Sequence, residues 1–145
     1  MTSVGSSTTA TETGSAVDRM VSFVDLAPTL LSIVGTDIPE FMQGNAFLGD
    51  QVTDDPVYAH MTQGRMDERI DMSRAVRDKK YRYISNYMPF RIPLQHLAYL
   101  FTATSAKAWE DAFKAGKGTD IQRAPFLPKP VEELYDTEND PWEVH

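Results

Sequence analysis

The amino-acid sequence predicts an α+β fold in which helices pack with an antiparallel sheet. The clearest signal is a pair of β-prone runs, residues 72–77 and 81–87, in which charged residues are interleaved with apolar ones. Asp78–Lys80 joins the two runs, a pattern typical of a hairpin with one solvated face. Apolar residues then recur with helical spacing over residues 105–115, and a last short strand is expected at residues 133–136.

Composition narrows the class of protein. The chain has 145 residues, 14 basic and 21 acidic side chains, a net charge of −7 and no cysteine. A hydrophobic fraction of 41% and a charged fraction of 24% are ordinary for a soluble globular chain of about one domain. The lack of cysteine excludes disulfides, thiolate metal sites and a cysteine nucleophile. The net acidity argues against nucleic acid as a partner, because binding phosphates requires a surplus of Lys and Arg.

The first part of the sequence contains no targeting or membrane signal. Residues 1–16 are rich in Ser, Thr and Gly and lack both a basic region and an apolar region, so we expect a disordered leader rather than a secretory signal. The longest apolar stretch, residues 20–35, contains Asp25 and Pro28 and is too short and polar to span a membrane. The compartment is left open.

The first regular elements are expected directly after the leader. A β-prone run at residues 21–24 precedes a helix predicted at residues 26–34, with Asp25 as its N-cap and Gly35 just past its end. Helical spacing predicts that the buried side of this helix is formed by Leu26, Leu30, Ile33 and Val34.

The middle and end of the chain alternate loops with short elements. Residues 36–56 are interpreted as an irregular connection and residues 57–61 as a short strand. After the hairpin, helices are predicted at residues 95–101 and 105–115, the second capped by Ser105 and ended by Gly116.

Charge is unevenly distributed along the sequence. Residues 65–91 contain eight basic and four acidic side chains, a local charge of +4 within an acidic protein. Arginine forms bidentate hydrogen bonds with sulfate, phosphate and carboxylate, so this segment would suit an anionic ligand. The alternative is a solvated hairpin face balanced by the acidic C-terminal residues.

Several candidate chemical groups lie in or near this segment. Residues 65–69 place four charges in five positions directly after a predicted strand, which is typical of a binding loop or of a surface salt-bridge cluster. His60 and His96 each stand alone, so packed or exposed histidines are the alternative to ligands or acid–base groups. Residues 73–77 fit a loose S-x-A-x-R string, which we interpret as coincidence because it lies inside a predicted strand.

Four groups of motifs lie in order along the sequence. They are VSFVDLAPTLL at 21–31, MQG at 42–44, RAVR at 74–77 with YRYI at 81–84, and ELYD at 133–136 with NDPWE at 139–143. In order and spacing these motifs resemble the C-terminal part of a type I, formylglycine-dependent sulfatase. The stretches at 67–69 and 86–89 most resemble the heparan N-sulfatase, or sulfamidase-like, branch.

The resemblance implies a fold and a domain organisation. Residues 57–145 would form the C-terminal subdomain of an alkaline-phosphatase-like α/β sulfatase, and residues 17–56 a remnant of the main domain's strand and helix with a connecting loop. The parent family uses calcium and formylglycine, and no part of this sequence matches its formylglycine motif or metal aspartates. We therefore expect no catalytic residue, metal site or cofactor in this chain, which alone would be inactive.

The resemblance also implies a site and a function. In the family, the loop after the first strand of the subdomain faces the substrate, so the candidates for contacting a sulfated sugar are His60, Arg65, Asp67, Glu68 and Arg69. The chain would then be a sulfatase fragment that forms a wall of the substrate cleft, with a sulfatase N-terminal domain or a sulfated sugar as partner. The parent family is often periplasmic, secreted or lysosomal. Two alternatives remain, a stand-alone binding module for anionic glycans and a poorly folding gene remnant.

Overall fold

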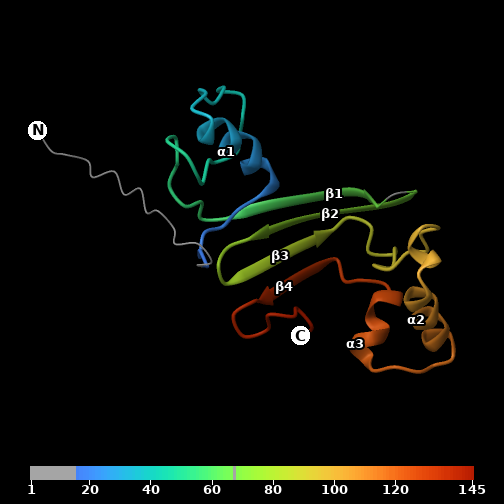
Figure 1. Cartoon of the computed structure of the whole chain (residues 1–145). Coiled ribbons are helices and arrows are strands. Elements are labelled where there is room, and N and C mark those ends of the chain that lie inside the picture. Colours follow the sequence, from blue (N-terminus) through green and yellow to red (C-terminus); the bar gives the residue numbers. More distant parts are fainter. Residues whose placement is uncertain (1–15, 67) are drawn as a thin grey trace, which may run out of the picture. The chain divides into compact units, whose positions relative to one another are not determined.

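The computed structural model describes residues 16–66 and 68–145. Of the leader expected at residues 1–16, all but Ala16 lies outside the described residues. The chain divides into two compact units between Pro56 and Val57. The first unit contains helix α1 and the second contains the four strands with helices α2 and α3 (Figure 1). No helix within the described residues is long and apolar enough to cross a membrane.

The second unit is built on a four-stranded antiparallel sheet in the order β1-β2-β3-β4, which confirms the predicted α+β class. Each strand pairs with the next one along the sequence, so the sheet is a meander. The central strands match the predicted hairpin closely, and β4 matches the predicted last strand. The strands are β1 (Ala59–Met66), β2 (Arg69–Arg77), β3 (Tyr81–Asn86) and β4 (Glu132–Asp136).

Two helices lie together beyond one end of this sheet (Figure 1). They are α2 (Thr104–Lys114), which confirms the predicted second helix, and the short α3 (Asp120–Arg123), which was not predicted. The predicted cap is wrong, because Ala103 is at the N-cap position and Ser105 lies inside α2. An aromatic cluster packs beside them: the rings of Phe113 and Phe126 stack at 4.6 Å, and Trp109 meets Phe126 edge-on at 5.5 Å. The indole N–H of Trp109 donates to the Gln122 carbonyl at 2.8 Å, which joins α2 to α3.

The helix predicted at residues 95–101 is wrong. Residues 95–99 are not helical, and a 3-10 turn is formed only at Leu100–Thr102. The amides near this segment bond to distant partners instead of to a helix: Leu94 donates to the Pro125 carbonyl and Ala98 to the Glu68 carboxylate, both at 2.8 Å. Inward-pointing Gln95 and Leu97 are buried while His96 between them is exposed, a period of two that does not suit a helix.

The first unit confirms the predicted helix as α1 (Leu26–Ile33) but not the β-prone run before it. A 3-10 turn, Phe23–Asp25, occupies the second half of that run. Its cause is local: the Ser22 amide donates to the Asp25 carboxylate at 2.7 Å, and the Asp25 amide donates back to the Ser22 carbonyl at 3.0 Å. This reciprocal pair closes a turn that an extended strand could not form.

The buried side of α1 is the opposite of the one predicted. The leucine side is exposed, with Leu30 at 63% and Ile33 at 54% of full exposure, whereas Asp25 before the helix and Thr29 within it are each only 3% exposed. Both sets of residues have helical spacing, so periodicity alone cannot choose between them. Hydrogen bonding determines which side of α1 is buried, because the backbone amides of the loop that packs on α1 require acceptors.

That loop, residues 44–51, is attached to α1 by three side-chain acceptors one turn apart. The amide of Asn45 donates to the Asp25 carboxylate at 2.7 Å. Further along, the Phe47 amide donates to Thr29 Oγ1 at 3.2 Å and the Gln51 amide to Ser32 Oγ at 2.8 Å. The polar side of the helix therefore accepts hydrogen bonds from the loop amides, and the apolar side faces away from the loop.

Replacing Gly49 with alanine is expected to destabilise the first unit by about 2 kcal/mol. Gly49 has a φ of +90°, and a Cβ there would lie 2.4 Å from the carbonyl carbon of Ser32. Hydrogen exchange of the Gln51 amide should accelerate accordingly. Gly64→Ala is the matched control, because a Cβ at Gly64 meets nothing within 4 Å. Equal exchange in both variants would contradict the close packing of loop and helix.

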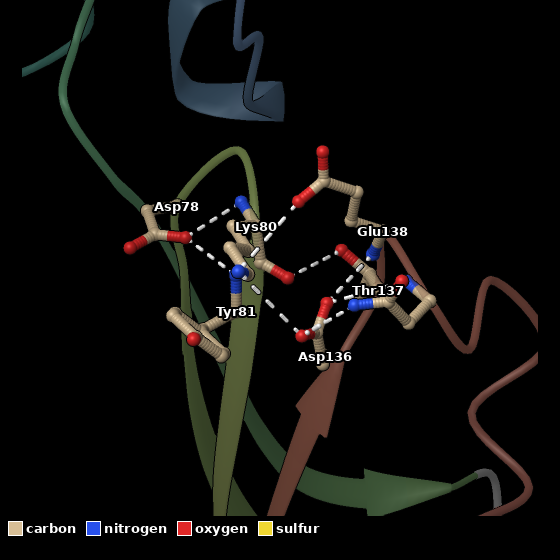
Figure 2. A network of polar contacts seen from close by, with 7 residues as sticks. Asp78, Lys80, Tyr81, Asp136, Thr137 and Glu138 are labelled. Atoms are coloured by element: carbon tan, nitrogen blue, oxygen red, sulfur yellow. Dashed lines mark hydrogen bonds and ion pairs between the residues drawn. The ribbon is translucent and has the colours of Figure 1, made fainter.

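A polar network closes the turn between β2 and β3 and ties it to the end of β4 (Figure 2). The Asp78 carboxylate accepts from the amides of Lys80 and Tyr81 at 2.8 and 2.5 Å. The Thr137 amide donates to the Lys80 carbonyl at 2.7 Å, and the Lys80 ammonium lies 3.7 Å from the Asp136 carboxylate. These contacts fix the pairing register of β3 with β4.

The charge of Asp136 gives this turn a dependence on pH. Hydrogen bonding from the Asn139 side chain, with Lys80 nearby, holds the pKa of Asp136 below its ordinary value of 3.8. A lowered pKa contributes stability that is present above the ordinary value and lost as the pH falls through the folded-state pKa. We expect Asp136→Asn to be less stable than the wild type at pH 7, with the gap closing below about pH 3.8. A gap in urea midpoint that stays constant down to pH 2 would contradict this role.

Candidate functional site

The β1–β2 hairpin ends in a tight tip that carries most of the candidate residues. Backbone pairing continues through Arg65 with Ile70 and Met66 with Arg69, so Arg65, Met66 and Arg69 belong to strand ends rather than to the loop that the sequence predicted. The pairing register shifts between Gln63 and Arg65, which marks a bulge at Gly64. Arg65, Glu68 and Arg69 are exposed there, and Asp67 lies outside the described residues.

Glu68 and Arg69 hold the segment at residues 96–98 against the tip. The Glu68 carboxylate accepts from the Ala98 amide at 2.8 Å, and Arg69 Nε donates to the His96 carbonyl at 2.9 Å. Leu97 between them is almost fully buried. One acidic and one basic side chain thus position a second segment beside the tip, a role that the sequence did not indicate.

His96 is brought to this cluster, although the sequence placed it in a helix of its own. Its ring is stacked on Phe101 with the centroids 4.2 Å apart, and its backbone receives the Arg69 bond described above. The ring is exposed. No local pattern could have found it, because the contact joins residues 27 positions apart. Arg65, Glu68, Arg69 and His96 are called the hairpin-tip cluster below.

His60 does not join the hairpin-tip cluster. It lies at the start of β1, paired with Val76, and its ring meets Tyr58 edge-on at 5.0 Å. Arg65 lies five positions further along the strand, a distance of about 16 Å along an extended chain. The predicted site is therefore divided between the two ends of β1.

A buried ion pair lies two residues inside the tip. Both carboxylate oxygens of Asp71 accept from the Lys129 ammonium at 2.5 Å, and the two side chains are only 4% and 9% exposed. Nearby, the Gln95 amide group donates to the Ile70 carbonyl at 3.3 Å. These contacts attach β2, next to the tip, to two later segments of the chain.

The same buried face carries a second polar network toward β4. Asn86 donates to both the Pro130 carbonyl and the Glu133 carboxylate, and the Tyr135 hydroxyl donates to the other oxygen of Glu133. Burial and the hydrogen bond to Glu133 raise the pKa of Tyr135 well above its ordinary value, so it remains a protonated donor. The network stabilises the sheet by joining β3 to β4.

The chemistry available at the hairpin tip is recognition of an anion. Guanidinium groups bind sulfate through paired, charge-assisted hydrogen bonds, and Arg69 has further N–H donors besides the one directed at His96. Within residues 16–66 and 68–145, no three His, Asp or Glu side chains gather as a calcium site would require.

A match to a protein-family model shows the family of this chain. The model described as "N-sulphoglucosamine sulphohydrolase, C-terminal" matches residues 7–93, a range that contains α1 and the whole β1–β2 hairpin. The chain belongs to this sulfohydrolase C-terminal family. The match confirms the resemblance to the sulfamidase-like branch of the sulfatases, and the serine string at residues 73–77 lies within β2, as expected.

This member of the sulfohydrolase C-terminal family is similar to two ulvan-active sulfatases of Formosa agariphila. One is 39% identical over 87% of this chain and 21% of its own length, and the other 32% identical over 91% and 25%. The chain thus spans between a fifth and a quarter of the curated relatives it matches. A solved structure from Bacteroides thetaiotaomicron, provisionally classed as a sulfatase, aligns with 83% of this chain and 18% of its own at 20% identity and a TM-score of 0.46.

Proposed function

We propose that this chain supplies the C-terminal part of a sulfatase, with the hairpin tip forming part of the wall of the cleft that holds a sulfated sugar. The observation that carries the proposal is the family match, which runs through the hairpin tip. The exposed basic side chains there suit the charge of a sulfated ligand. The hydrolytic chemistry would come from the catalytic portion of the sulfatase, because sulfate-ester cleavage needs a nucleophile and a cation.

The residues of the hairpin tip have different roles in this proposal. Arg65 and Arg69 bind sulfate oxygens, while Glu68 keeps the segment at 96–98 in place through its bond to the Ala98 amide. Asp67 accepts from sugar hydroxyls. His60, at the far end of β1, contacts a sugar unit further along the same glycan, since it is too distant to share a unit with the tip.

The proposal is tested in a chimera in which this 145-residue chain replaces the aligned segment of an ulvan-active sulfatase. Arg69→Ala is expected to raise KM for ulvan oligosaccharides about ten- to hundredfold, the cost of losing charge-assisted hydrogen bonds. A small aryl sulfate reaches the reacting centre but not the cleft wall, so its kcat and KM should be unchanged. Arg77→Ala, an exposed arginine at the opposite end of β2, is the control. Equal effects on both substrates would contradict a cleft-wall role.

Glycan binding by the chain alone receives less support. Two basic residues of the 65–91 segment have acidic partners, since Arg82 pairs with Glu143 and Lys80 lies 3.7 Å from both Asp136 and Glu138. Pairing of this kind lowers the local positive potential. We expect the isolated chain to pass through a heparin column at low salt, and retention that moderate salt reverses would favour the binding module instead.

A further inference from the structure

We infer that the outer side of α1 is the surface on which the catalytic portion of a sulfatase docks. This outer side consists of Leu26, Leu30, Ile33 and Val34. The inference rests on the proposed function and goes beyond it, because it assigns the interface to a particular surface of the first unit rather than to the hairpin tip.

The outer side of α1 is exposed although the helix is already packed. Leu30 is 63% exposed, and Phe23 in the preceding turn is 90% exposed. The opposite side is fully engaged with the loop at 44–51 through Asp25, Thr29 and Ser32. Turning the helix over to hide its leucines would break three hydrogen bonds, so the apolar side can be covered only by something that arrives from outside this packing.

The first unit has almost no apolar core of its own. Among its described residues, the fully buried apolar positions are Ala46 and Pro28, both small. Most of its large apolar side chains are exposed instead, and the stretch from Leu26 to Gly35 contains no charged residue. An uncharged apolar surface of this kind fits another apolar surface and not a sulfated ligand.

The length of chain outside the structure identifies the occupant. The matched part is 21% of one curated relative and 25% of the other, so 79% and 75% of their lengths lie outside it. A body of that size has ample surface to cover one side of an eight-residue helix. Residues 1–15 of this chain have only Met1 and Val4 as large apolar side chains, so they cannot supply the cover.

The test compares two exposed isoleucines in two contexts. Ile33 on α1 and Ile121 on α3 are 54% and 52% exposed, so Ile33→Glu and Ile121→Glu are matched. In the isolated 145-residue chain, both variants should melt like the wild type. In the chimera with the ulvan-active sulfatase, Ile33→Glu should lose the cooperative melt and the aryl-sulfatase activity, because it buries an unpaired charge, while Ile121→Glu keeps both.

Each other outcome overturns the inference in a distinct way. An active chimera that tolerates Ile33→Glu would leave the proposed function standing and remove this interface. A chimera that contains the wild-type chain and is inactive would contradict both the proposed function and this interface. If Ile33→Glu lowers the melting point of the isolated chain, the side is covered within the chain itself. If sedimentation shows a dimer that Ile33→Glu dissociates while the chimera tolerates it, the occupant is a second copy.

Discussion

Asp71→Ala is expected to lower the free energy of unfolding of the second unit by about 3–5 kcal/mol, the cost of leaving one partner of a buried ion pair alone. Asp71 and Lys129 are both buried, and their bonds join β2 to a segment 58 residues later. Both tryptophans, Trp109 and Trp142, lie in this unit, so urea denaturation followed by tryptophan fluorescence reports on it directly.

The double variant Asp71→Ala with Lys129→Met distinguishes a lost contact from a stranded charge. Removing both charges leaves no unpaired ion, so the double variant should be more stable than Asp71→Ala alone. If the losses of unfolding free energy from the two single substitutions simply add in the double variant, Asp71 and Lys129 do not interact. The buried pair would then not support the hairpin tip.

Asp25→Ala is the second large effect, expected to cost the first unit about 3 kcal/mol. The Asp25 carboxylate accepts from the amides of Ser22 and Asn45, both at 2.7 Å, and its loss leaves both donors without an acceptor. The first unit contains no Trp or Tyr, so amide hydrogen exchange is the suitable measurement. Exchange of the Asn45 amide should become on the order of a hundredfold faster.

Asp37→Ala is the control for this effect, since Asp37 is an exposed aspartate in the same unit. It should leave the exchange of the Asn45 amide unchanged. Asp25→Asn, which retains one acceptor oxygen, should fall between the wild type and alanine. Equal exchange rates in Asp25→Ala and Asp37→Ala would mean that the loop at 44–51 is held to α1 by other contacts.

The elements predicted correctly from the sequence are those with local causes. The β2–β3 hairpin follows from alternation around a short polar turn in which Asp78 accepts two amides, and α2 follows from apolar spacing and a glycine stop. The length of β1 was underestimated because the charged residues at 65 and 69 read as a loop, whereas backbone pairing extends through them. Charge on a strand end is compatible with pairing when the side chain reaches solvent.

The missed features depend on contacts between distant residues. The orientation of α1 is decided by amides of the loop at 44–51, and the non-helical course of residues 95–99 is decided by bonds to Glu68, Arg69 and Pro125. Propensity and periodicity contain no information about such partners. For the same reason the sequence placed His60 with the tip and did not place His96 there, since both assignments require the fold.

The most direct test of the central claim is the sulfatase activity of the chimera in which this chain replaces the aligned segment of an ulvan-active sulfatase. We expect the chimera to hydrolyse an aryl sulfate in the presence of calcium, while the same sulfatase without the segment, and this chain alone, do not. A chimera that melts cooperatively but has no activity would contradict the claim, as would robust turnover by this chain alone.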